Sequence, residues 1–121
     1  MATPRHIHPL RDVDGFIAGA LVDSTSGMMI ESLATGGFDI EAASAANTQV
    51  VQAKLKAMKA VGLGEQVIED ILITLSEHYH LIRPLRFNRE VFAYLAIDRR
   101  HGNLALARME MKKLDQAIER L

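Results

Sequence analysis

Two histidines, His78 and His80, come closest to forming a chemical site in this chain. Residues two apart in an extended strand share a face, so their imidazoles would point the same way. Such a pair can begin a transition-metal site. Glu77 is close in sequence, but no complete ligand set is evident, and an exposed polar strand explains the pair more simply. We therefore expect no metal ion here, nor at His6 and His8 in the N-terminal lead-in.

The carboxylates, hydroxyls and glycines form no catalytic set either. Glu69 and Asp70 are adjacent, so in a strand they would point to opposite faces and could not act as an acid–base pair. No serine stands in a G-x-S-x-G nucleophile elbow. The segment Gly62-Leu63-Gly64 lacks the following Gly-Lys-Ser/Thr of a phosphate-binding loop. We expect neither an enzyme nor a resident cofactor.

A basic loop, Asp98-Arg99-Arg100-His101-Gly102, separates an apolar run from a helical one. A solvated loop is the usual explanation for such a sequence. The alternative is a positive patch that contacts an acidic partner, or that supplies an arginine in trans to a GTPase. Three further arginines could extend this patch, namely Arg83, Arg86 and Arg89. We keep Arg99 and Arg100 as candidate partner-binding residues.

The composition is that of a soluble globular protein. Its 121 residues suit one domain over residues 13–121, preceded by an irregular lead-in or short helix over residues 1–12. A net charge of −1 creates no field that would gather nucleic acid or anionic lipid. The absence of cysteine excludes disulfides and thiolate metal sites. No apolar run has the length of a membrane span or a signal peptide, so we expect a cytoplasmic protein without membrane insertion.

The first half of the chain predicts a hairpin followed by a long helix. Apolar residues on both faces predict strands over Phe16–Asp23 and Met28–Leu33, joined by a glycine-containing turn. Asp39 is a suitable N-cap for a helix that runs to about Val61, where Gly62 would stop it.

The second half predicts three strands and a closing helix. The strands are expected over Val67–Leu75, Tyr79–Phe87 and Val91–Asp98, and Asn103 would cap a helix reaching Leu121. Short connections make the hairpins antiparallel, and strands that are apolar on both faces need helices above and below. The predicted fold class is therefore α/β (α+β), with three layers around a five-stranded antiparallel sheet.

The long helix has an unusually wide apolar arc. One side is lined by Ile40, Ala43, Ala46, Val50, Ala53, Ala57 and Val61, and Val51, Leu55 and Met58 extend it. A helix on the surface of a monomer needs an apolar stripe of roughly 100°, and this arc is about twice as wide. The helix is therefore predicted to pack against its own sheet and against a second copy. Asn47 and Lys54 fall within the arc, where a partly hydrated dimer interface would suit them.

Three segments in this order resemble the Roadblock/dynein light chain family, which has a profilin-like fold. They are the opening strand Asp14–Asp23, the segment Leu81-Ile82-Arg83-Pro84-Leu85, and the start of the closing helix, Asn103–Met111. The resemblance covers about residues 13–121. One departure is that the family has a full first helix before its opening hairpin, so its absence here implies a less covered sheet face.

The resemblance implies a homodimer whose long helices lie together and whose following edge strands join into one sheet. The predicted interface comprises Val50, Val51, Lys54, Leu55, Met58, Ile71 and Ile73. In bacterial relatives of this type, the paired helices are a docking platform for a small Ras-like GTPase. Candidate contacts for such a partner, besides the two loop arginines, are Thr48, Gln52, Lys56 and Lys59 on the polar edge of the helix.

The sequence is also compatible with two other functions. The same dimer could be a scaffold subunit of a motor or signalling complex, without effect on GTP hydrolysis. The third hypothesis is a small-molecule sensor, since similar three-layer folds can hold ligands between sheet and helix.

Overall fold

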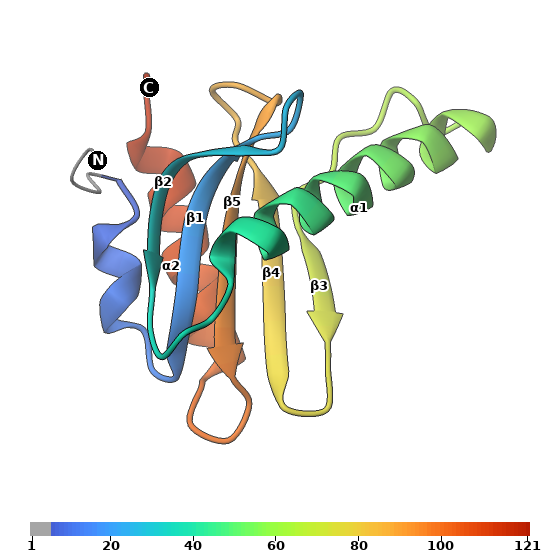
Figure 1. Cartoon of the computed structure of the whole chain (residues 1–121). Coiled ribbons are helices and arrows are strands. Elements are labelled where there is room, and N and C mark those ends of the chain that lie inside the picture. Colours follow the sequence, from blue (N-terminus) through green and yellow to red (C-terminus); the bar gives the residue numbers. More distant parts are fainter. Residues whose placement is uncertain (1–5) are drawn as a thin grey trace.

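The computed structural model describes residues 6–121 and shows one antiparallel sheet between two helical layers (Figure 1). The part of the predicted lead-in over residues 1–5 lies outside the described residues. The elements are η1 (His8–Asp12), β1 (Phe16–Asp23), β2 (Met28–Ala34), α1 (Ile40–Ala60), β3 (Ile71–Thr74), β4 (His78–Pro84), β5 (Val91–Asp98) and α2 (Leu104–Ala117). The strand order is β2-β1-β5-β4-β3, and every neighbouring pair is antiparallel. The predicted fold class is confirmed.

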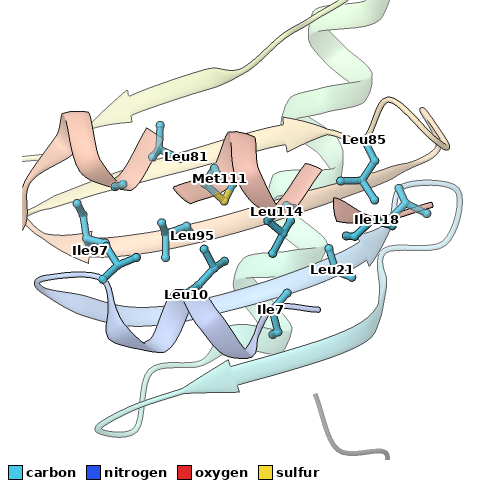
Figure 2. Packing of buried hydrophobic residues seen from close by; sticks show 14 residues of the cluster. Ile7, Leu10, Leu21, Leu81, Leu85, Leu95, Ile97, Met111, Leu114 and Ile118 are labelled. Carbon is cyan, nitrogen blue, oxygen red and sulfur yellow. The ribbon is translucent and has the colours of Figure 1, made fainter. Parts of the chain in front are cut away.

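Each face of the sheet has its own apolar core. On one face, α1 packs through Val51 over Ile82, Phe92 and Tyr94. On the other face, η1 and α2 pack over the opposite side chains of the same strands. Figure 2 shows this second core, which includes Ile7, Leu10, Leu21, Leu81, Leu85, Leu95, Ile97, Met111, Leu114 and Ile118. Three layers are therefore required, because the central strand β5 presents buried side chains to both sides.

The short 3-10 helix η1 covers the face that the absence of a full first helix was expected to leave less covered. Its flanking Ile7 and its own Leu10 are 0% and 1% exposed. The carboxylate of Glu31 on β2 accepts hydrogen bonds from the backbone N–H of His6 and of Ile7, at 2.8 and 3.2 Å. Burying two large aliphatic side chains stabilises this arrangement by about 3–6 kcal/mol.

The ends of the elements follow local capping signals where these exist. Asp39 accepts a hydrogen bond from the Ala42 N–H and begins α1, and Asn103 does the same for the Leu106 N–H at the start of α2. Gly62 takes a φ of +81° directly after the C-cap of α1, as a helix-stopping glycine does. These three predictions are confirmed.

Three predicted boundaries are wrong, and tertiary contacts explain two of them. The strand expected from Val67 begins only at Ile71, because the Ile68 carbonyl accepts from Arg89 and Asp70 pairs with Arg108. The strand expected to reach Phe87 ends at Pro84, because the chain turns towards β5 after Leu85, whose N–H donates to the Val91 carbonyl at 2.9 Å. The last helix ends at Ala117 because Ile118 adopts an extended backbone and turns into the core.

A buried ion pair joins the end of α2 to β4. Asp115, whose side chain is fully buried, accepts from Arg83 Nε at 2.9 Å and from the Arg86 backbone N–H at 2.8 Å. Both carboxylate oxygens are therefore satisfied. A buried charge that loses its partner is costly, so this contact anchors α2 to the sheet.

Replacing Asp115 with alanine is expected to lower the free energy of unfolding by about 3–5 kcal/mol, because the Arg83 guanidinium would lose its buried partner. Urea denaturation measured by circular dichroism checks this value. The exposed Glu119→Ala variant, just beyond the end of α2, is the control and should change the free energy by less than about 0.5 kcal/mol. A loss below about 1 kcal/mol for Asp115→Ala would show that the pair is not important for stability.

Candidate interaction surface

The C-terminal half of α1 extends beyond the edge of the sheet (Figure 1). A helix of 21 residues is about 31 Å long, whereas the outermost of five strands are only about 19 Å apart. Residues 52–57 are all exposed, and Met58 is the only buried residue of the last nine helical positions. Half of this helix is therefore only lightly supported by its own sheet.

The two flanks of α1 have different chemistry. Gln52 donates from Nε2 to the Ser24 carbonyl at 2.7 Å, which places its flank towards the β1–β2 hairpin. Helical spacing puts a small apolar row on the other flank, towards β3, namely Ala46, Val50, Ala53 and Ala57. The alanines of this row are exposed and Val50 is half-buried. This flank can approach another helix closely because its side chains are short.

The predicted dimer residues are distributed between this surface and the core of the same chain. Val51 and Met58 are 2% and 7% exposed, since the chain's own sheet covers them. Val50, Ile71 and Ile73 pack at the margin of the core under α1 and stay partly accessible. The remaining two, Lys54 and Leu55, are exposed.

A groove of about 830 Å³ lies beside β3. Lys54 and Met58 of α1 line one side, and Arg108 and Met109 of α2 line the other. The loop over residues 63–70 runs along it, fixed where Arg108 donates to both oxygens of Asp70 at 2.9 Å. The projecting helix, the groove and the β3 edge therefore form one continuous surface.

The candidate partner-binding residues of α1 do not all face solvent. Thr48 is 6% exposed, and its hydroxyl donates to the Ser44 carbonyl at 2.9 Å, so the prediction that it lies on the polar edge is wrong. Its side faces the hairpin, where Gly27 leaves room for the helix. Lys56 and Lys59 are exposed, and within residues 6–121 neither makes an ion pair. With Gln52 they form the polar row of the helix.

The loop arginines have separate environments. Arg99 donates to the Leu75 carbonyl at 2.8 Å, and its guanidinium lies 5.1 Å from the centre of the Tyr79 ring. It therefore connects the loop after β5 with the turn between β3 and β4. Arg100 is exposed, with only its backbone N–H bonded to Asp98.

The expected patch that combined these two arginines with three others does not form. The register of β4 and β5 places Asp98 beside His78 at one end of the sheet and Phe92 beside Pro84 at the other. The arginines at positions 83, 86 and 89 lie near that second end. Arg83 and Arg89 are there engaged with Asp115 and with two backbone carbonyls.

A polar cluster beneath α1 was not anticipated from the sequence. His78 Nδ1 lies 3.3 Å from His80 Nε2, and His80 Nδ1 lies 3.3 Å from the Tyr94 hydroxyl. The side chain of Asn47 on α1 also interacts with that hydroxyl and partly offsets the effect of burial on the Tyr94 pKa. Asn47 is 6% exposed, so it belongs to the contact with its own sheet and not to a hydrated dimer interface, which corrects the earlier placement. In the sequence, the sign of this cluster was the two-residue spacing of the histidines, which places both on one face of a strand.

The electrostatics of this cluster disfavour charge. Burial, and secondarily the neighbouring His78, lower the pKa of His80. Burial raises the pKa of Tyr94 to about 12. Among residues 6–121, no group of three or more histidines, cysteines or carboxylates is placed to hold a metal ion. Protonation of His80 and ionisation of Tyr94 are therefore both disfavoured in this connection between the sheet and α1.

Comparison with known proteins identifies the architecture. No protein-family model matches the chain, and no curated protein matches it. Among solved structures, Myxococcus xanthus MglB is 18% identical with a TM-score of 0.75, covering 96% of this chain and 87% of that one. A Roadblock/LC7 domain from Streptomyces avermitilis is 12% identical, also at 0.75, covering 88% and 85%. This chain has the Roadblock/LC7 fold.

A third Roadblock-like match is described as MglB with a tetrameric arrangement. It is 13% identical with a TM-score of 0.75, and covers 91% of this chain and 79% of that one. At such identities the likeness establishes the fold alone. Within residues 6–121, none of the helices has the length and apolar character to cross a membrane.

The histidine cluster predicts a pH-dependent stability. The folded protein binds a proton at His80 less tightly than the unfolded chain does, so this contribution is intact above the ordinary pKa of 6.5 and is lost as the pH falls below it. The free energy of unfolding between pH 7 and pH 5 should therefore fall less steeply in His80→Gln than in the unmodified protein. Urea titrations at several pH values measure both slopes.

The exposed His8→Gln variant is the control and should keep the unmodified slope. Equal slopes for His80→Gln and the unmodified protein would show that His80 does not carry the effect.

Proposed function

We propose that this chain is a non-enzymatic homodimeric module that binds a small Ras-like GTPase and modulates its nucleotide cycle or its placement. The observation that carries the proposal is the projecting half of α1, whose small apolar flank lies beside the free edge of β3. The resemblance to Roadblock proteins supports the choice of partner.

A second copy of the chain would cover both exposed features at once. Two α1 helices that approach through Ala46, Val50, Ala53 and Ala57 would bury these side chains. The same approach would bring two β3 edges together and remove unpaired strand edges from solvent. The tetrameric arrangement of the MglB structure is further support for self-association.

The polar row of α1 remains accessible in such a dimer. Gln52, Lys56 and Lys59 lie on the flank opposite the small apolar row. A two-fold axis would present this row twice on one surface. Lysines without ion-pair partners favour an acidic partner surface and speed its encounter more than they tighten the complex.

The small apolar flank predicts a variant that abolishes self-association. Ala57→Glu places a charge where two helices would meet, and should raise the dissociation constant of the dimer at least tenfold, or about 1.4 kcal/mol. Because Ala57 is exposed in the single chain, folding should be unaffected. Sedimentation equilibrium measures the constant, and circular dichroism checks the fold. Lys59→Glu on the opposite flank is the control and should leave the dimer intact.

The polar row predicts the converse behaviour. Lys56→Glu combined with Lys59→Glu should keep the dimer and weaken GTPase binding at least tenfold, because both charges would repel an acidic surface. The measurement is capture of the tagged protein from its native cells, followed by titration of the recovered GTPase with GDP or a GTP analogue. Lys113→Glu on α2, in the other helical layer, reverses one exposed charge away from the polar row and is the control, which should leave GTPase binding unchanged.

Hydrolysis rates with and without the module would separate regulation from scaffolding. Unchanged rates with a stable complex would favour the scaffold function. Capture that recovers no GTPase in either nucleotide state would contradict the proposal.

A further inference from the structure

Four polar side chains connect the start of β4 to α1, and we call them the polar relay: His78, His80, Tyr94 and Asn47. His78 Nδ1 lies 3.3 Å from His80 Nε2, and the two rings are stacked with 5.4 Å between their centroids. His80 Nδ1 lies 3.3 Å from the Tyr94 hydroxyl, with which the Asn47 side chain also interacts. Tyr94 is 0% exposed and Asn47 is 6% exposed, so water cannot replace their partners unless α1 moves.

The same histidines also contact the residue that leads into α1. The ring of Phe38 lies 6.4 Å from that of His78 and 6.3 Å from that of His80. Phe38 directly precedes Asp39, the N-cap of the helix. The histidine pair therefore lies against two points in the first half of α1, its start and the turn that contains Asn47. A change in the charge of the pair acts on this half of the helix.

The hydrogen positions of the neutral relay follow from its end on α1. Burial raises the pKa of Tyr94, and Asn47 lowers it, as an amide N–H that donates to the tyrosine oxygen would. The hydroxyl of Tyr94 can then donate its own hydrogen to His80 Nδ1. A neutral imidazole that accepts at one nitrogen donates from the other, so His80 Nε2 donates to His78 Nδ1. All three donors point in one direction, from α1 towards the start of β4.

A proton taken up by either histidine removes this arrangement. A doubly protonated His80 carries hydrogen on both ring nitrogens. If His78 takes the proton instead, its Nδ1 donates to His80 Nε2, and His80 then carries its own hydrogen on Nδ1. In both cases an N–H faces the Tyr94 oxygen, so the hydroxyl hydrogen has to turn towards Asn47. The Asn47 amide then meets it hydrogen against hydrogen, unless this side chain rotates or withdraws.

The elements around the pair offer little to neutralise a positive charge. In the ladder, Ile73 and Ala96 lie on either side of His80. Asp98 lies opposite His78, but its carboxylate accepts from a backbone N–H and lies 3.2 Å from a ring nitrogen in its own loop. Burial, and secondarily the neighbouring imidazole, accordingly lower the pKa of His80. The other ionisable side chains on the adjoining segments are Glu77, exposed in the turn before β4, and Asp39 and Glu41 at the start of α1.

We propose that the polar relay is a proton-sensitive latch on α1. Proton uptake by the histidine pair reverses the contact between His80 and Tyr94, forces Asn47 to rotate or withdraw, and loosens the first half of α1 on the sheet. Every contact of the relay lies within one chain, so the latch does not depend on the proposed homodimer or on its GTPase partner. It would act on both, because α1 contains the polar row and the small apolar flank.

Amide hydrogen exchange of the full chain tests the latch, with rates expressed as protection factors so that the intrinsic effect of pH is removed. Between about pH 8 and about pH 5, the protection of residues 40–48 should fall about tenfold more than that of residues 104–117 in α2. Tyr94→Phe keeps the ring and removes the hydroxyl, so both helices should then respond alike. His8→Gln, at an exposed histidine in the opposite layer, is the control and should behave as the unmodified protein.

Long-range 1H–15N NMR spectra of the same samples show which ring nitrogens carry hydrogen. At about pH 8, His80 should carry its hydrogen on Nε2, and in Tyr94→Phe the pair should still titrate while α1 stays protected. A merely structural role of Tyr94 would not separate these two readouts. Hydrogen on His80 Nδ1 at the higher pH would overturn the direction of the relay.

The exchange data can also contradict the latch directly. Equal changes of protection in α1 and α2 of the unmodified protein would overturn it, as would an extra loss in α1 that persists in Tyr94→Phe. If Tyr94→Phe folds poorly, His80→Gln replaces it, because a glutamine takes up no proton in this pH range. The extra loss in α1 should then disappear, and its persistence would overturn the proposal.

Discussion

The complete burial of the central strand β5 is the constraint on which the rest of the structure depends. Every residue from Val91 to Ile97 is buried, so this strand needs a neighbour on each side and a helical layer on each face. β1 and β4 supply the lateral contacts, and their own apolar faces extend both cores. The positions of α1, α2 and η1 are consequences of this requirement. The protein must present two helical surfaces to solvent, and α1 is the one that is too long for its sheet.

The two helical layers are held to the sheet by different chemistry. Below α2 and η1 the contact is almost entirely aliphatic, and the buried Asp115 is paired. Below α1 the strands present small side chains such as Ala20 and Ala96, and the helix presents Ser44, Asn47 and Thr48. The Ser44 hydroxyl has no hydrogen-bond partner among the described residues. The α1 layer therefore buries less apolar surface, and contact of its free flank with another molecule would stabilise it further.

Local signals made much of this fold predictable, whereas long-range contacts decided what was missed. The bounds of β1 and β5 follow directly from runs of apolar residues, and Asp39 and Asn103 cap their helices through contacts three residues away. The start of β3 depends instead on Arg108, whose pairing with Asp70 joins residues 38 positions apart.

The candidate site was harder to predict for a related reason. Alanine is compatible with a helix face that is buried, exposed or joined to a partner, so the wide apolar arc of α1 did not show which part contacts the sheet. Asn47 and Thr48 lie at the sheet because Tyr94 and Gly27 leave suitable positions for them, and both positions are set by tertiary packing. The sequence therefore predicted that the polar row includes Thr48, whereas this residue is buried.

The two edges of the sheet differ in how they are protected, and this difference bears on which of them joins another molecule. β2 has an irregular register opposite Leu21 and Val22, and its Glu31 is engaged by the N-terminal segment. Irregularities and inward charges are devices that discourage an edge from pairing. β3 has neither feature, and its residues are uncharged and regular in register. Since the apolar flank of α1 projects on the same side, a single contact would satisfy both the unpaired strand and the unsupported helix.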